Sequence, residues 1–211
     1  MKAYDYIADY FHAQGVEVIF EVVGGTITHL LDSIHKRKKI RVISVHHEQT
    51  AAFAADAYGR MRNHPCVAMA TSGPGATNLL TGIGSCFYDS TPAVFISGQV
   101  NRHQLKGSRG VRQLGFQETD IVSMAKPITK AAWLVEDASK LPQILEDAFR
   151  LACEGRPGPV LIDIPMDVQQ EPIEGPLSRL KLPVPKVTAL PGEIWSTLQS
   201  ASRPLVIVGS G

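Results

Sequence analysis

Residues 41–57 read RVISVHHEQTAAFAADA, and this stretch carries the strongest fold signal in the chain. Its first five residues are rich in β-branched side chains and predict an inner strand of a parallel sheet. The five alanines between residues 51 and 57 predict a helix without a bulky face, which must pack closely on its neighbours. Glu48 lies at the junction, where we expect a buried acid. A carboxylate at a helix start also suits the helix dipole, so its position alone leaves both interpretations open.

Apolar runs alternate with helical segments along most of the chain. Strands are expected at 17–22, 41–45, 66–70, 93–97 and 159–164, and helices at 4–14, 26–36, 49–61, 76–87, 118–124 and 138–153. Strands that are continuously apolar are typical of a sheet covered on both faces. The sequence therefore predicts an α/β fold with a doubly wound parallel sheet and helices on both faces.

The composition describes an ordinary globular protein. Hydrophobic residues make up 44% and charged residues 19%, with a net charge of +1, which argues against nucleic acid as a partner. Three cysteines without a C-x-x-C pair favour neither a disulfide framework nor a zinc site. The first residues form an amphipathic helix and no apolar run is long enough to span a membrane, so we expect a cytoplasmic protein without membrane contact.

In a doubly wound sheet, ligands bind beyond the carboxyl ends of the strands. Four expected strands end in residues suited to a ligand, namely Gly24-Gly25, His47-Glu48, the loop 71–78 and Gly98-Gln99. Glycines allow the backbone to approach a ligand closely, and hydroxyl and amide side chains near a helix start offer donors and acceptors. We therefore expect a flat polar ligand at this edge.

The loop 71–78 reads TSGPGATN. A lone G-x-G is commonly only a tight strand-to-helix connection. The loop lacks the Gly-Lys-Ser/Thr ending of a P-loop, and Asn78 stands where a dinucleotide-binding fingerprint has its third glycine. These departures argue against a plain nucleotide-binding Rossmann domain.

Taken together, the motifs resemble the N-terminal, pyrimidine-binding domain of thiamine-diphosphate enzymes of the acetolactate synthase type. The resemblance covers roughly residues 1–170 and rests on six ordered motifs. They are Gly24-Gly25, His47-Glu48, the loop 71–78, Gly98-Gln99-Val100, residues 116–120 (FQETD) and residues 155–160 (GRPGPV).

The resemblance implies a role for Glu48 as the carboxylate that hydrogen-bonds the aminopyrimidine ring and so activates the cofactor. It also implies that the cofactor-binding residues are Gly24, Gly25, Glu48, Thr71, Gly73, Pro74 and Asn78. Phe116 and Gln117 are expected near the reacting end, although Phe116 equally suits core packing. We interpret His46 and His47 as hydrogen-bonding neighbours of Glu48 rather than as metal ligands.

Other implied features depend on regions that this sequence lacks. The family binds Mg²⁺ through a separate domain with a Gly-Asp-Gly motif, which does not occur here, so no metal ligand is assigned to this chain. A middle domain sometimes holds FAD, for which Arg156 would be a contact. We expect a pyrimidine-binding domain at 1–170, a linker with a short helix near 192–200 at 171–203, and the start of a truncated Rossmann-like domain at 204–211. The chain then represents part of a longer enzyme and is expected to be inactive alone.

The resemblance predicts a thiamine-diphosphate-dependent transferase or lyase that decarboxylates a 2-oxo acid and passes on the acyl anion, with acetolactate formation from pyruvate as the leading case. Family active sites lie between subunits, which implies a homodimer or tetramer. Val23 and Met166 depart from the Pro and Lys usual in acetolactate synthases, and the loop 101–115 is longer. A different 2-oxo acid or an acyl-CoA substrate therefore remains an alternative, as does a non-catalytic dimerisation module.

Overall fold

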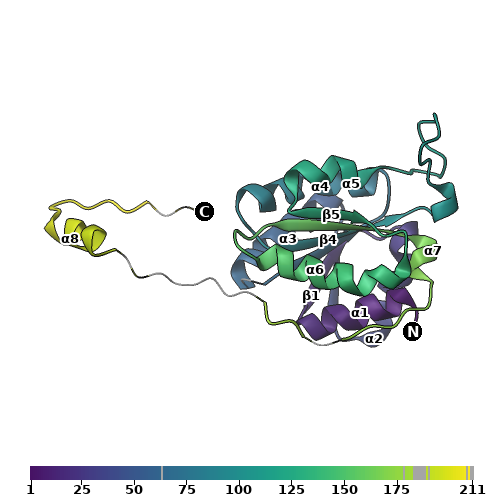
Figure 1. Cartoon of the computed structure of the whole chain (residues 1–211), viewed down its shortest axis with the longest axis horizontal. Coiled ribbons are helices and arrows are strands. Elements are labelled where there is room, and N and C mark those ends of the chain that lie inside the picture. Colours follow the sequence, from purple (N-terminus) through teal and green to yellow (C-terminus); the bar gives the residue numbers. More distant parts are fainter. Residues whose placement is uncertain (63, 178, 183–188, 190, 208, 210–211) are drawn as a thin grey trace.

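The computed structural model describes residues 1–62, 64–177, 179–182, 189, 191–207 and 209. The body of the chain is an α/β fold around one sheet of six parallel strands in the order β2-β1-β3-β4-β6-β5 (Figure 1). The strands are β1 (Val18–Glu21), β2 (Arg41–Ser44), β3 (Cys66–Ala70), β4 (Ala93–Gln99), β5 (Ala131–Leu134) and β6 (Pro159–Pro165). The predicted doubly wound architecture is confirmed.

Helices cover both faces of this sheet. In Figure 1, α1, α2 and α6 lie on one side of the strands, and α4 and α5 lie on the other. The α-helices are α1 (Ala3–Gln14), α2 (Thr28–Arg37), α3 (Glu48–Arg62), α4 (Pro74–Tyr88), α5 (Ile121–Ala125), α6 (Leu141–Cys153), α7 (Met166–Gln169) and α8 (Gly192–Ser200). Short 3₁₀ turns are η1 (Gly25–Ile27), η2 (Arg102–Gln104), η3 (Lys126–Ile128) and η4 (Ala138–Lys140).

The central strands divide their side chains between two hydrophobic cores. In β3, Val67 and Met69 pack with α1, α2 and α6, whereas Ala68 and Ala70 pack with α3, α4 and α5. Successive side chains of a strand point to opposite faces, so a strand covered on both sides must be apolar at every position. This requirement explains the continuous apolar runs in the sequence.

The alanine-rich helix α3 packs closely on α4, as its composition predicted. A Cβ placed on Gly82 would lie only 2.3 Å from the Cβ of Ala52. At the end of α3, a Cβ on Gly59 would lie 2.9 Å from the carbonyl oxygen of Pro92. Small residues on both helices are therefore a packing requirement of this face.

Two sequence predictions about the sheet are wrong. Residues 41–45 were expected as an inner strand, but β2 lies at the edge of the sheet and pairs only with β1, which leaves Arg41 and Ser44 exposed. The opposite edge strand, β5, was not predicted, because Ala131–Leu134 is short and its residues are only partly buried. Because β5 has only four residues and none of them is fully buried, its apolar signal is weak.

After β6 the chain returns along α1. Tyr6 Oη donates a hydrogen bond of 2.7 Å to the carbonyl of Pro176, and Ala3 N donates to the carbonyl of Glu171. The helix expected near 192–200 is confirmed as α8. The predicted G-x-G at the end falls partly on residues 210–211, which lie outside the described residues. Residues 204–207 pair with none of the described strands. Within the described ranges, no helix has the length and apolar character needed to cross a membrane.

Candidate functional site

The carboxyl edge of the sheet brings Glu48 and Asn78 together. Glu48 is the first residue of α3, and Asn78 lies in the first turns of α4. Asn78 Nδ2 donates a hydrogen bond of 2.9 Å to Glu48 Oε2. Glu48 Oε1 has no hydrogen-bond partner among the described residues, and a Cβ on Gly75 would lie 3.3 Å from it. One carboxylate oxygen is therefore held by the protein while the other is free to meet a ligand.

The surroundings of Glu48 differ from expectation in two ways. Its side chain is half-buried rather than buried, because the turn before α3 lies at the edge strand β2. His46 and His47 are exposed, and neither ring bonds to Glu48 in the described part of the chain. His47 Nδ1 instead accepts a hydrogen bond of 3.1 Å from Gln49 N. The imidazole ring is therefore held at the start of α3 by a backbone group two residues away.

Two threonines join the loops after β1 and β3. The hydroxyls of Thr26 and Thr71 share a hydrogen bond of 2.8 Å, and Ser72 N donates to Thr26 Oγ1 at 3.0 Å. A Cβ on Gly24 would lie 2.4 Å from Thr71 Cβ, so only glycine fits there. Thr26 and Thr71 thus hold the two loops against each other, and the missing side chain of Gly24 allows their close approach.

The remaining predicted residues line the same edge. Gly25 is exposed with open space where a Cβ would be. Gly73 has φ +66° and precedes Pro74, the first residue of α4, and a Cβ on Gly73 would lie 2.7 Å from the Cβ of Gln117. Gln117, itself at φ 58°, therefore lies against this loop. Phe116 is 80% exposed, so it is not a core residue.

Arg156 lies elsewhere. It lies three residues before β6, which begins at Pro159, so it belongs to the amino edge of the parallel sheet, opposite Glu48. Its Nε donates 2.7 Å to Ser90 Oγ, and the side chain lines a pocket of about 270 Å³ with Phe87, Tyr88 and Lys130. The residue predicted to contact FAD is thus separate from the residues predicted to contact the pyrimidine.

A buried polar network that the sequence did not predict lies behind the site. Gln169 Nε2 donates to the carbonyls of Thr26 at 2.8 Å and Ile164 at 2.9 Å, which supports the residue that bridges the two loops. The position of Thr26 directly after two glycines was the available signal. Gln169 comes from a different part of the chain, and no local pattern predicted its contact.

A second missed feature is the carboxyl of Asp163 within β6. Asp163 accepts hydrogen bonds of 2.7 Å from Ser97 Oγ and 2.8 Å from Gln99 Nε2. Complete burial is the main cause that raises the pKa of Asp163 to about 7, while the two hydrogen bonds act in the opposite direction. An aspartate inside the apolar run 159–164 was the signal for this buried acid.

The arrangement around Glu48 fits the pyrimidine half of thiamine diphosphate. A flat ring with donor and acceptor nitrogens needs a carboxylate with a free oxygen and backbone that can approach closely, and Glu48 Oε1 and Gly25 supply these. No cluster of three or more His, Cys, Asp or Glu side chains in the described ranges is placed to hold a metal ion. Arg102, in the loop 101–115, forms ion pairs with Asp167 and Glu171, so its charge is already balanced by the protein.

Comparison with known proteins agrees with this assignment. Residues 1–124 match the model of the thiamine pyrophosphate enzyme, N-terminal TPP binding domain. Acetolactate synthase 3, chloroplastic, of Brassica napus is 38% identical over 100% of this chain and 32% of the relative. The acetolactate synthase large subunit of Parasynechococcus marenigrum is 41% identical over 97% of this chain and 34% of the relative. The chain thus spans about a third of the length of these relatives, and it belongs to the family of thiamine pyrophosphate enzyme N-terminal TPP binding domains.

Proposed function

We propose that this chain is the pyrimidine-binding domain of a thiamine-diphosphate-dependent enzyme that decarboxylates a 2-oxo acid and transfers the acyl anion, with pyruvate as substrate and acetolactate as product. The observation that carries the proposal is the pair formed by Glu48 and Asn78, in which one carboxylate oxygen is fixed and the other is free. The names of the relatives support the choice of reaction.

The residues of this chain act on the aminopyrimidine ring. Thiamine diphosphate, when bound, supplies the carbon nucleophile that attacks the 2-oxo acid. Glu48 Oε1 exchanges a proton with a ring nitrogen, and Asn78 holds the carboxylate in the orientation that this exchange needs. Gly25, Gly73 and Pro74 let the backbone approach the ring, while Gln117 stands at the substrate side of the loop.

Further parts of the proposal concern the whole enzyme. We propose that residues 1–170 form the pyrimidine-binding domain, that residues 171–203 link it to a Rossmann-like domain starting at 204, and that Mg²⁺ is held by a domain outside this chain. A homodimer or tetramer completes the site.

We also propose a cytoplasmic location, which the free cysteines support. FAD is proposed at the amino edge, where the apolar pocket beside Arg156 has an aromatic wall.

The alternative is a thiamine-diphosphate lyase with another 2-oxo acid or an acyl-CoA substrate. Val23 is 68% exposed beside the glycines that approach the ligand, so it is placed to affect what enters the site. Met166 follows β6 directly and offers no charge to an anionic substrate. A non-catalytic module is a weaker alternative, because such a module has no need for a half-free carboxylate held by an amide.

The product of the complete reading frame that contains this sequence tests the proposal. It is assayed with thiamine diphosphate, Mg²⁺ and pyruvate, together with the variants Glu48→Gln and Glu193→Gln. Glu48→Gln is expected to lower turnover by a factor of about 10² to 10⁴, the range of general acid–base catalysis. Glu193 is exposed on α8 and its substitution is expected to change nothing. Equal loss in both variants would refute the role of Glu48. Turnover of another 2-oxo acid but not of pyruvate would favour the alternative substrate.

A further inference from the structure

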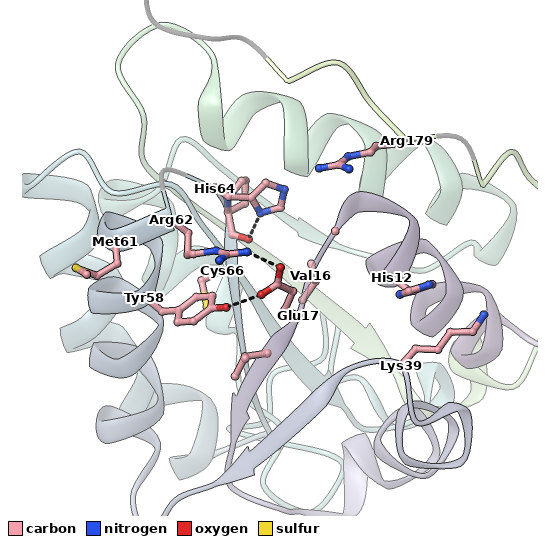
Figure 2. A pocket seen from close by; sticks show the side chains of 13 residues that line it. His12, Val16, Glu17, Lys39, Tyr58, Met61, Arg62, His64, Cys66 and Arg179 are labelled. Atoms are coloured by element: carbon pink, nitrogen blue, oxygen red, sulfur yellow. Dashed lines mark hydrogen bonds and ion pairs between the residues drawn. The ribbon is translucent and has the colours of Figure 1, made fainter.

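The amino edge of the sheet holds a second cavity, of about 600 Å³, which we call the amino-edge pocket. Its walls come from the ends of α1 and α3 and from the starts of β1 and β3 (Figure 2). Because the strands are parallel, this pocket lies at the opposite end of β1 and β3 from the Glu48 site. Its volume falls within the range of small-molecule sites, roughly 300–1,000 Å³.

Basic side chains surround this pocket. In Figure 2, Arg62 and His64 stand on one side of the opening, His12 and Lys39 stand on the other, and Arg179 lies above them. Glu17 is the single acidic residue among the described lining residues, against the three permanent cations Lys39, Arg62 and Arg179, which leaves a net charge of +2. The whole chain has a net charge of only +1, so this concentration of positive charge is local.

The single carboxylate is already engaged. Glu17 accepts hydrogen bonds from Arg62 and from Tyr58 Oη, the latter at 3.3 Å. Lys39 and Arg179 have no hydrogen bond or ion pair within the described part of the chain. These two cations therefore lack a counter-charge supplied by the protein.

Helix dipoles explain only part of this cluster. His12 lies in the last turn of α1 and Arg62 in the last turn of α3, where a cation suits the partial negative charge of the helix end. Lys39 and Arg179 lie in the last turn of no helix. Like charges held in one pocket repel each other. An anion bound between them would reduce this electrostatic repulsion and so stabilise the folded chain.

We propose that the amino-edge pocket binds a small ligand with a diphosphate chain, such as a nucleoside diphosphate or inorganic diphosphate. Cations on both sides of the opening suit a chain of anionic groups better than a single one, and guanidinium and ammonium groups are the usual partners of phosphate oxygens. The ring of Tyr58 lines the same pocket and contacts the Arg62 guanidinium, 5.9 Å from its centroid, and the ring of Phe20, so it helps to hold Arg62 in place. The proposal is independent of the activity proposed for the Glu48 site.

Isothermal titration calorimetry of the chain with ADP, inorganic diphosphate and adenosine tests this proposal. We expect ADP and diphosphate to bind with a dissociation constant below about 1 mM and adenosine not to bind. Lys39→Gln and Arg179→Gln should each weaken ADP binding about three- to fivefold, as expected for loss of one exposed ionic contact. Both side chains are exposed and unpaired, so their loss leaves the fold intact. Lys126→Gln, an exposed lysine outside the pocket, is the matched control.

Amide chemical shifts then locate the ligand. Shifts at Val16, Val18 and Cys66 on addition of ADP support the amino-edge pocket. Shifts confined to Gly25 and Gly75 would assign the ligand to the Glu48 site and overturn the proposal. Absence of binding by both ADP and diphosphate would also overturn it, as would equal effects of Lys126→Gln and the two pocket variants. Tighter binding of ADP than of diphosphate identifies a nucleotide as the ligand, and equal binding identifies the phosphate chain alone.

Discussion

Asn78 Nδ2 donates a hydrogen bond of 2.9 Å to Glu48 Oε2, and this bond joins the starts of two helices that are separated by a whole strand in the sequence. Glu48 Oε1 has no hydrogen-bond partner in the part of the chain that the structure describes. The chemistry proposed for this chain depends on that asymmetry, because only the free oxygen can exchange a proton with a ligand.

Asn78→Ala should therefore impair the activity that we propose for the full-length protein. Loss of a hydrogen bond to a charged group costs about 1.5–3 kcal/mol, so we expect turnover or cofactor affinity to fall by about one to two orders of magnitude. Steady-state kinetics with varied thiamine diphosphate measures this effect. Gln143→Ala, on the exposed face of α6, is the control. Activity of Asn78→Ala equal to that of the control would show that Glu48 needs no such support.

The close packing of α3 on α4 should make the chain sensitive to a larger side chain at their contact. Gly82→Ala should destabilise the chain by about 1–3 kcal/mol, because the new methyl group would overlap Ala52. Gly84→Ala lies on the same helix, where the nearest atom to a new Cβ is 3.9 Å away, and it should be neutral or stabilising by up to about 1 kcal/mol. Urea unfolding of both variants measures the difference. Similar stabilities of the two variants would show that α3 and α4 can move apart to accept the methyl group without a loss in the free energy of unfolding.

The loop glycine Gly73 is under two constraints, a backbone conformation that favours glycine and close contact with Gln117. Gly107 has φ +53° with no atom within 4 Å of a new Cβ. Gly107→Ala should therefore lower the free energy of unfolding only by the strain of a side chain at positive φ, about 1–2 kcal/mol. Gly73, at φ +66° and ψ −132°, lies outside the left-handed helical region, so an alanine there costs about 1–3 kcal/mol in backbone strain and also presses on Gln117, which adds about 1–3 kcal/mol. Unfolding free energies test this order. A Gly73→Ala variant no less stable than Gly107→Ala would contradict the contact with Gln117.

Asp163 makes stability depend on pH. Its pKa is raised from 3.8 to about 7 in the folded chain, so between these values the folded state binds more protons than the unfolded state. The stabilising effect of its protonated form is complete below about pH 4 and is lost as the pH rises through about 7. The loss amounts to about 4 kcal/mol at most.

Asp163→Asn removes this titration, and its amide can still pair with Ser97 and Gln99 because a hydroxyl also accepts. We expect the variant to lose less stability than the wild type between pH 5 and pH 8, as measured by urea unfolding at both values. The same pH dependence in both proteins would show that Asp163 is ionised throughout.

The sequence by itself determined the class of fold and the identity of the central residues at the candidate site. Continuous apolar runs such as 66–70 and 159–164 predict buried parallel strands, and a carboxylate between a strand and an alanine-rich helix predicts a ligand-binding edge. These signals are local, because periodicity and helix starts are encoded within a few neighbouring residues.

The tertiary structure decided everything that depends on residues far apart in the chain. It placed β2 at the edge of the sheet, which left Glu48 half-buried, and it brought Gln169 to Thr26 and Gln117 to Gly73. It also gathered Lys39 and Arg179 around one hollow at the opposite edge. Burial, hydrogen-bond partners and local charge are set by which segments become neighbours on folding, and no short window of sequence contains that information.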